Sequence, residues 1–273
     1  MALKVGYVSD LHLEFQRAPD FSKEEGGDVL ILAGDITTAS VLSPNRTDQD
    51  SMKSKKALLK LKTELLDKYK VVLYVMGNHE HYRFTFEDTI PAIRQHLDLI
   101  GCSNVVVMDD NILQYKEVCF IGNSLWSDFM KENPNSMLAA WEGMNDYRII
   151  ACRESFGTIT PEFILGKHKT HRNYINVTAN ALSDMPVVVI THHGPTLKSL
   201  NALHSGNSLD GAYCSDLSNI ILDNKNIKYW VHGHTHAHLD YKVGECNVLA
   251  NQRGYEDYDD SFNQFTGIKH FEV

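Results

Sequence analysis

Side chains that can bind metal ions follow predicted strands at five places in this sequence. At each place an apolar run stops and carboxylate, imidazole or carboxamide groups come next, as Asp10-Leu11-His12, Gly34-Asp35, Gly77-Asn78-His79-Glu80, Thr191-His192-His193-Gly194 and His232-Gly233-His234-Thr235-His236. Ligands of α/β proteins gather beyond the carboxyl ends of the strands, so we expect these segments to converge. Their donor atoms are oxygen and nitrogen without a thiolate, which favours Mn²⁺, Fe or Zn²⁺. The pattern therefore predicts a metal centre.

The inference depends on the order of the five segments, because each segment alone has an ordinary explanation. An Asp-x-His sequence occurs by chance at caps and turns, and Gly-Asp after a strand is common turn chemistry. The spacing of Asp10 and His12 puts both side chains on one side of an extended chain. His234 and His236 share a face in the same way. Five such segments, each directly after a strand, indicate a common site.

The elements that must position these groups alternate between strands and helices. Continuous apolar runs predict buried strands at 3–8, 28–32, 71–75 and 187–190. Apolar residues at helical spacing predict helices over 51–68, over 86–100 and from 160 onward. This alternation predicts an α/β fold with helices packed outside the sheets.

Short strands that lie close together in the sequence predict hairpins, and therefore mixed sheets. They form two clusters, at 105–108, 112–115 and 118–121, and at 229–232, 239–242 and 247–249. Residues 123–185 carry few strand signals and several aromatics, so we predict an insertion or cap-like region within a single domain of residues 1–273. The acidic segment 255–260 is predicted to be solvated.

Composition narrows the class of protein further. The chain has 273 residues, of which 43% are hydrophobic and 22% charged, which is ordinary for a soluble globular domain and excludes wholesale disorder. Its net charge of −9 argues against a nucleic-acid coat or a protein that binds anionic membranes. No recognisable nucleic-acid-binding domain is added.

The cysteines and the apolar runs predict a cytoplasmic protein. Five scattered cysteines, never spaced as C-x-x-C, are typical of reduced and buried thiols. The first residues run directly into a predicted strand without a signal-peptide pattern. No apolar run approaches the roughly 20 residues needed to cross a bilayer, so we expect no membrane segment.

The five segments resemble the motif series of the calcineurin-like metallophosphoesterases. That series is D-x-H, G-D, G-N-H-[DE], a histidine at a strand end, and G-H-x-H, and all five motifs are present in this order between residues 10 and 236. Three further segments resemble a subgroup common in bacteria and phages: Leu125-Trp126-Ser127-Asp128-Phe129, Met144-Asn145-Asp146-Tyr147-Arg148 and Asn251-Gln252-Arg253-Gly254-Tyr255.

This resemblance implies a fold of two facing mixed β-sheets flanked by helices, a four-layer sandwich with two divalent metal ions at one edge. The implied ligands are Asp10, His12 and His236 for the first ion, Asn78, His192 and His234 for the second, and Asp35 as a bridge between both. A hydroxide between the ions would attack phosphorus in line. His79 matches the family histidine near the leaving group and is the candidate general acid.

Some neighbouring residues have open roles. Successive strand residues point opposite ways, so only one of His192 and His193 should bind metal. We favour His192 because it is nearer the strand end, and His193 is left as a candidate for substrate binding. His232 and His238 extend the alternating histidines, and we expect them to support the site rather than bind an ion.

The basic and aromatic candidates also have alternatives. Arg253 and Arg83 could each grip a phosphate bidentately, although an ordinary surface arginine is an equally good explanation. Trp126 and Trp141 are expected to pack within the core or the inserted region rather than stack on substrate.

These observations favour a dinuclear metal phosphoesterase that acts on phosphodiesters or phosphomonoesters of small or nucleotide-like substrates. A phosphoprotein phosphatase shares the motifs, but an arginine usually precedes its G-N-H-E run, and Met76 stands there in this chain. A nuclease would be expected to have a basic groove, which the charge disfavours. A metal-free scaffold should lack ligands, and none is missing. The oligomeric state is left open.

Overall fold

The chain forms two mixed β-sheets that face each other, in a computed structural model that describes residues 2–203 and 205–273. The first sheet has the order β13-β1-β2-β3-β4, with β1 (Lys4–Val8), β2 (Gly27–Ala33), β3 (Tyr69–Val75), β4 (Val105–Met108) and β13 (Lys269–Glu272). The second has the order β11-β12-β10-β9-β6-β5, with β5 (Asn111–Tyr115), β6 (Val118–Gly122), β9 (Val187–Ile190), β10 (Ile227–His232), β11 (His238–Val243) and β12 (Cys246–Asn251). The predicted pair of mixed sheets is confirmed.

The core between the sheets follows from the alternation of side chains along each strand. In β2, Val29 and Ile31 face the second sheet, whereas Leu30 and Leu32 face the helices outside. Strand β9 contributes Val188 in the same way to the layer between the sheets. Both faces of each sheet are covered, which explains why these strands read as continuous apolar runs.

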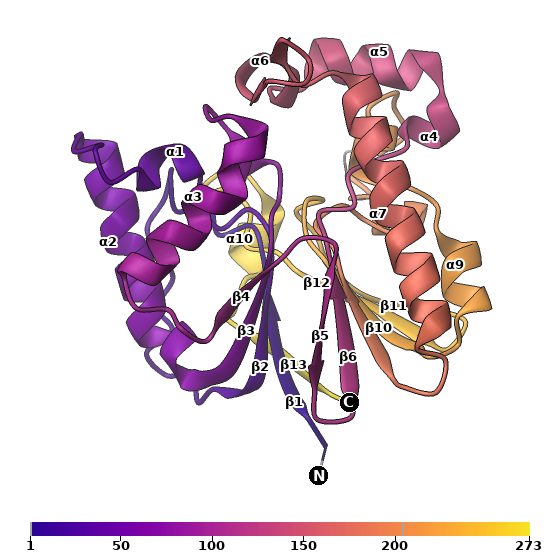
Figure 1. The fold of residues 1–273 in the computed structure, drawn as a ribbon, viewed down its shortest axis with the longest axis horizontal. Coiled ribbons are helices and arrows are strands. Elements are labelled where there is room, and N and C mark those ends of the chain that lie inside the picture. The colour runs from indigo at the N-terminus through magenta and orange to yellow at the C-terminus, as the bar shows by residue number, and fades with distance from the viewer. Residues whose placement is uncertain (1, 204) are drawn as a thin grey trace.

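Helices cover the outer face of each sheet and complete four layers (Figure 1). On the first sheet these are α2 (Gln49–Glu64) and α3 (Phe86–Leu99), and on the second they are α7 (Pro161–Ala181) and α9 (Ser218–Asp223). The shorter helices are α1 (Ala39–Leu42), η1 (Leu66–Lys68), η2 (His79–His81), α4 (Phe129–Glu132), α5 (Pro134–Gly143), α6 (Asp146–Ile149), η3 (Leu197–Ser199), α8 (Asp210–Tyr213) and α10 (Asp260–Gln264). None of the helices in the described part of the chain is long and apolar enough to cross a bilayer.

Two details differ from the sequence-based expectation. The predicted helix over 51–68 is broken at Leu65, whose φ of −132° ends α2 before the short η1 begins. Strand β4 does not join the neighbouring hairpin of β5 and β6, because it pairs in parallel with β3 in the first sheet. The chain therefore passes from one sheet to the other between β4 and β5, through Asp109 and Asp110.

Residues 123–185 connect β6 to β9, which are parallel neighbours in the second sheet. Helix α7 is the crossover helix of this connection, and α4 to α6 with the two short strands β7 (Ala151–Cys152) and β8 (Gly157–Thr158) precede it. These small elements lie at the end of the molecule opposite the two termini (Figure 1). They share a separate apolar core that includes Trp126, Phe129 and Tyr147.

The aromatic residues of this segment lead to a stability prediction. Trp126 and Tyr147 are buried, whereas Trp141 keeps 42% of its surface exposed. Trp126→Ala and Tyr147→Ala should each lower the free energy of unfolding by about 3–5 kcal/mol, because truncation of a buried aromatic leaves a cavity. Trp141→Ala is the control and should cost much less. Thermal melts test this, and variants that change substrate ranking while melting normally would show that the two aromatics form a substrate wall instead.

Candidate metal centre

The five predicted segments meet between the two sheets, beyond the carboxyl ends of the strands that precede them. Three groups of side chains bring their ligand atoms within 4.8 Å of one another: Asp10 with His12 and His236, His12 with Asp35 and His79, and Asp35 with His192 and His234. Asp35 belongs to two of these groups. The convergence expected from the strand ends is therefore present in the structure.

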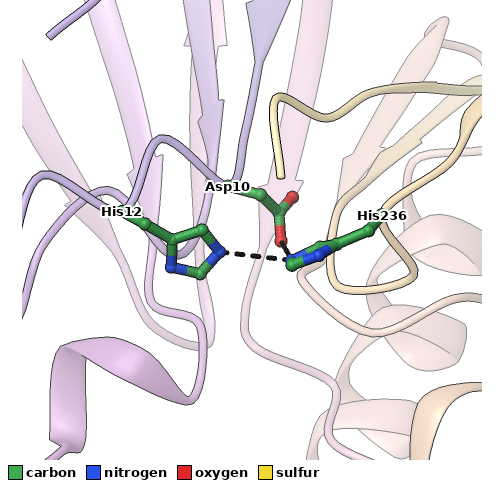
Figure 2. Close-up of side chains that lie close together, drawn as sticks. All are labelled: Asp10, His12 and His236. Atoms are coloured by element: carbon green, nitrogen blue, oxygen red, sulfur yellow. Dashed lines mark hydrogen bonds and ion pairs between the residues drawn. The ribbon is translucent and has the colours of Figure 1, made fainter. Parts of the chain in front are cut away.

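The first group is formed by Asp10, His12 and His236 (Figure 2). The Nε2 atoms of His12 and His236 lie 3.2 Å apart, and His236 Nε2 is 3.4 Å from Asp10 Oδ1. Asp259 accepts a hydrogen bond of 2.6 Å from His236 Nδ1, which leaves Nε2 for the interior of the site. Two imidazole nitrogens and a carboxylate oxygen that point at one another fit a divalent cation.

The second group is built around Asp35 and His192. His192 Nε2 lies 3.4 Å from Asp35 Oδ2 and 3.2 Å from Asn78 Oδ1, while its Nδ1 donates to the carbonyl of Ala33 at 2.8 Å. His234 completes the group, and its buried Nε2 has no hydrogen-bond partner. A buried imidazole nitrogen without a partner is costly unless an ion accepts its lone pair, so this donor set also fits a divalent cation.

Backbone conformation shows how tightly these groups are held. The residues Asp10, His12, Asp35, His234 and His236 all have φ between 46° and 71°, in the left-handed region. Side chains other than glycine rarely adopt this conformation, and such residues cluster at functional sites where the surroundings enforce it. Each strand therefore ends in a sharp turn that aims the next side chain inward.

The glycines of the motifs make room for the ligands. A Cβ at Gly77 would overlap Asp35 Oδ1 and lie 2.7 Å from His192 Nε2. A Cβ at Gly34, whose φ is +88°, would overlap His192 Nδ1. These two positions explain why the motifs contain Gly-Asp and Gly-Asn-His, because any side chain there would displace a candidate ligand.

Glu80 fixes the turns after β2 and β3. Its Oε2 accepts from the backbone N–H groups of Asp35 at 3.0 Å and Gly77 at 2.6 Å. Its Oε1 accepts from the N–H of Ile36 at 2.7 Å and from the hydroxyl of Tyr74 at 2.6 Å. One buried carboxylate thus ties together the two strand ends that carry Asp35 and Asn78.

His79 lies beside both groups and is held at each ring nitrogen. Its Nδ1 donates to Glu14 at 2.8 Å, and its Nε2 is hydrogen-bonded to the Tyr255 hydroxyl oxygen at 2.9 Å. The Nε2 atom is also 4.0 Å from Asp35 Oδ2. Burial alone would lower the pKa of His79, but the charges of Asp35 and Glu14 outweigh it and raise that pKa. The protonated ring is therefore favoured, as a proton donor requires.

The same balance of burial and charge acts on the candidate ligands. Burial disfavours ionised Asp35, yet His192 and His79 hold its pKa well below the ordinary value. Burial likewise opposes the charge on His192, but Asp35 raises its pKa to about 9. Carboxylates and imidazolium groups thus neutralise one another here, a balance that bound cations would replace by releasing the protons.

Three important residues were missed from the sequence. Glu14 follows the Asp-x-His motif by two residues, and an acidic residue so close to two candidate ligands is a signal that could have identified it. Tyr255 and Asp259 belong to the tail that was expected to be solvated, and this expectation was wrong for both. Asp259 is buried against His236, and Tyr255 packs 4.4 Å from the His12 ring. The neighbouring His236 ring explains why the acidic side chain of Asp259 turns inward.

The remaining candidates lie outside the two groups. His193 is buried with Nδ1 donating to Ser124 O at 3.2 Å, and His232 is held between Ser199 Oγ and Gly233 O, each 2.9 Å away. His238 contacts the Ser261 carbonyl at 3.0 Å.

The two arginines are placed differently from each other. The Arg253 guanidinium donates to the carbonyls of Leu11 and Arg17 and lies over the Phe262 ring. Arg83 is exposed. Neither arginine lines the cavity that opens onto the candidate ligands.

That cavity has a volume of about 450 Å³ and reaches both groups. Asp35, Asn78, His79, His234 and His236 form its floor. Its walls are rich in phenol and amide side chains, namely Tyr82, Tyr213, Tyr255, Tyr258, Asn145, Asn201 and Asn207. No lysine or arginine lines it among the residues that the structure describes. It therefore combines hydrogen-bonding groups with aromatic and aliphatic surface.

The glycine geometry leads to a prediction about metal binding. Gly77→Ala should displace Asp35 or His192 and strongly reduce the metal content of the purified protein. Gly166→Ala is the matched control, because a Cβ there meets nothing within 4 Å and lies within α7, where alanine is the better residue. Metal analysis and a thermal melt are measured on both variants. A Gly77→Ala protein with normal metal content would show that the close packing does not position ligands.

Comparison with known proteins finds one similar sequence and similar folds over most of the chain. A protein of Acanthamoeba polyphaga mimivirus, named uncharacterized protein L509, is 28% identical and covers 96% of this chain and 95% of its own length. The structure of phosphopantetheinyl hydrolase from Mycobacterium tuberculosis is similar over 98% of this chain and 95% of its own, with a TM-score of 0.59 and 17% identity. A putative 5′-nucleotidase from Staphylococcus aureus is similar over 93% of this chain and 49% of its own, with a TM-score of 0.50 and 12% identity.

The family is identified by a match over most of the chain. A sequence profile of the calcineurin-like phosphoesterases matches residues 3–238, which include all five metal-binding segments. The match covers well over half of the chain. The protein therefore belongs to the calcineurin-like phosphoesterase family.

Proposed function

We propose that this protein is a dinuclear metal-dependent phosphoesterase. The observation that carries the proposal is a chain of overlapping donor groups: His12 belongs to the group of Asp10 and His236 and also to a group with Asp35, and Asp35 in turn belongs to the group of His192 and His234. Asp10, His12 and His236 would hold the first ion, and Asn78, His192 and His234 the second. Two closely spaced cations need an anion between them, and Asp35 is placed to supply it. The nitrogen and oxygen donors suit Mn²⁺, Fe or Zn²⁺.

The bound ions would supply Lewis-acid stabilisation of the phosphoryl oxygens and a water of lowered pKa as the nucleophile. The chain itself would supply the proton for the leaving group. His79 Nε2 faces the cavity and can protonate a leaving oxygen, while Glu14 at Nδ1 keeps the ring oriented and favours its protonated form. The Tyr255 hydroxyl oxygen, which is hydrogen-bonded to Nε2, occupies a position that a substrate oxygen would take.

The substrate is proposed to be a small phosphodiester or phosphomonoester, with nucleotide-like compounds among the candidates. The support is the cavity of about 450 Å³, whose phenol and amide walls can hold an organic group by stacking and hydrogen bonds. Residues 143–146 of the segment 123–185 form part of its wall, so we propose that this segment acts as a cap. His193 and Arg253 are not retained as substrate ligands, since neither lines the cavity, and His193 Nδ1 and Arg253 Nη1 bind backbone carbonyls.

Two other activities of the same fold are less well supported. A phosphoprotein phosphatase would use an arginine before the Gly-Asn-His run, where this chain has the buried Met76. A nuclease would require a basic groove, and no lysine or arginine lines the cavity among the residues that the structure describes. We also propose a cytoplasmic location, which is supported by five free and buried cysteines.

Removal of the bridging charge tests the dinuclear site. Asp35→Asn keeps the shape of the side chain but removes the anion between two cations, so both metal content and turnover should collapse. Asp240→Asn, an exposed aspartate on β11, is the control and should behave like the wild type. Metal stoichiometry is measured together with hydrolysis of a substrate panel in Mn²⁺. An Asp35→Asn protein with two ions and near-native turnover would contradict the proposal.

A comparison of leaving groups tests the role of His79. His79→Ala should lose roughly 10²–10⁴-fold in turnover of an alkyl ester, because an alkoxide leaves poorly without a proton. The loss should be far smaller for a nitrophenyl ester, whose leaving group needs no proton near neutral pH. Both rates are measured on protein shown to hold its full metal content. Equal losses on the two esters would instead assign His79 to phosphate binding or to orientation of the nucleophile.

A further inference from the structure

We propose that Asp146 is a positioning residue that acts through Tyr82 to keep the amide oxygen of Asn78 turned toward the metal centre. The inference rests on the proposed function, because it assigns Asn78 to the second ion. The inference gives a role to the Met144–Arg148 motif, which contains none of the proposed metal ligands and not the proposed general acid.

Three buried side chains form a hydrogen-bonded line that ends at the metal centre. Asn78 Nδ2 donates to the Tyr82 hydroxyl at 3.1 Å, and that hydroxyl donates to Asp146 Oδ2 at 3.1 Å. The amide oxygen of Asn78 faces the other way, 3.2 Å from His192 Nε2. All three side chains are buried. Tyr82 is additionally fixed by its ring, which packs 4.0 Å from that of His79.

The chemistry of these groups sets the direction of the line. An ionised carboxylate only accepts hydrogen bonds, whereas a phenol has one proton to donate and an amide can present either end. Because the Tyr82 proton is committed to Asp146, the phenol oxygen can only accept from Asn78. The amide nitrogen of Asn78 must therefore point at Tyr82, and its oxygen at the cations. Without Asp146, Tyr82 could donate to the amide oxygen, and the amide could turn its nitrogen toward the ions.

The position of Asp146 is set by contacts between the inserted segment and the chain that follows Asn78. The N–H of Arg83 donates to Ile149 O at 2.9 Å, and the N–H of Ala151 donates to Phe84 O at 3.0 Å. Asp146 begins α6, directly before these contacts. Burial raises the pKa of Asp146, while His79 and the Tyr82 hydroxyl stabilise its ionised form. The segment that forms the cavity wall is thus linked to a metal ligand.

The experiment measures ion affinities by calorimetric titration of metal-free protein with Mn²⁺. Tyr82→Phe removes one hydroxyl, Asp146→Ala removes the carboxylate, and Asp146→Asn keeps the shape while losing the acceptor-only character. Loss of an outer hydrogen-bond partner typically weakens a metal site roughly 10–100-fold. We expect Tyr82→Phe and Asp146→Ala to show this loss for one of two ions and normal affinity for the other. Asp146→Asn should fall between them and the wild type.

Tyr147→Phe is the matched control, because it removes a buried phenol next to Asp146 that has no contact with Asn78 in the described structure. It should bind both ions like the wild type. Three results would overturn the inference: unchanged affinities in Tyr82→Phe, equal weakening of both ions, or an Asp146→Asn protein that matches the wild type while Asp146→Ala does not. The last result would mean that Asp146 acts only by packing. A wild-type protein that binds a single ion would overturn the proposed function as well, so the two failures are distinguishable.

Discussion

The crowding of carboxylate and imidazole groups at strand ends of both sheets is the constraint on which the rest of this structure depends. Asp10, Asp35, His12, His192 and His236 belong to overlapping groups whose ligand atoms lie within 4.8 Å of one another, and all but the half-buried His236 are buried. Such a cluster is unfavourable unless cations or shared protons compensate it. Three features of the surrounding chain hold these side chains in place. They are backbone turns in the left-handed region, glycines at positions without room for a Cβ, and buried carboxylates that accept hydrogen bonds.

Three carboxylates that surround the candidate ligands hold different parts of the site in position. Glu80 binds the backbone of two strand ends, Asp259 orients His236, and Glu14 orients His79. Asp259 and Glu14 each bind the Nδ1 atom of a histidine, which directs the Nε2 atom of that ring toward the site. Metal sites commonly depend on such outer partners for orientation and affinity. The site is therefore built in two layers. The candidate metal ligands and His79 form the inner layer, and the outer carboxylates orient them.

Much of this architecture is visible in the sequence, because strand ends and metal-binding side chains leave local signals. Each of the five segments between Asp10 and His236 is recognisable because metal-binding side chains directly follow an apolar run. The structure brings these segments together. The role of Asp259 has no such signal, since it depends on a contact with His236 across 23 residues of chain. The pairing of β4 with β3 rather than β5 was equally hidden, because an apolar run of four residues suits either sheet. The sequence also does not reveal that Arg253, a candidate phosphate ligand, donates to backbone carbonyls.

The central claim is that two ions bind on either side of Asp35, and anomalous scattering from crystals grown with Mn²⁺ tests it most directly. The account predicts two peaks, one between Asp10, His12 and His236 and the other between Asn78, His192 and His234, with the Asp35 carboxylate reaching both. A single peak would contradict the account. So would a peak among His12, Asp35 and His79, because this third cluster of donors would then hold the ion that we assign to the other groups.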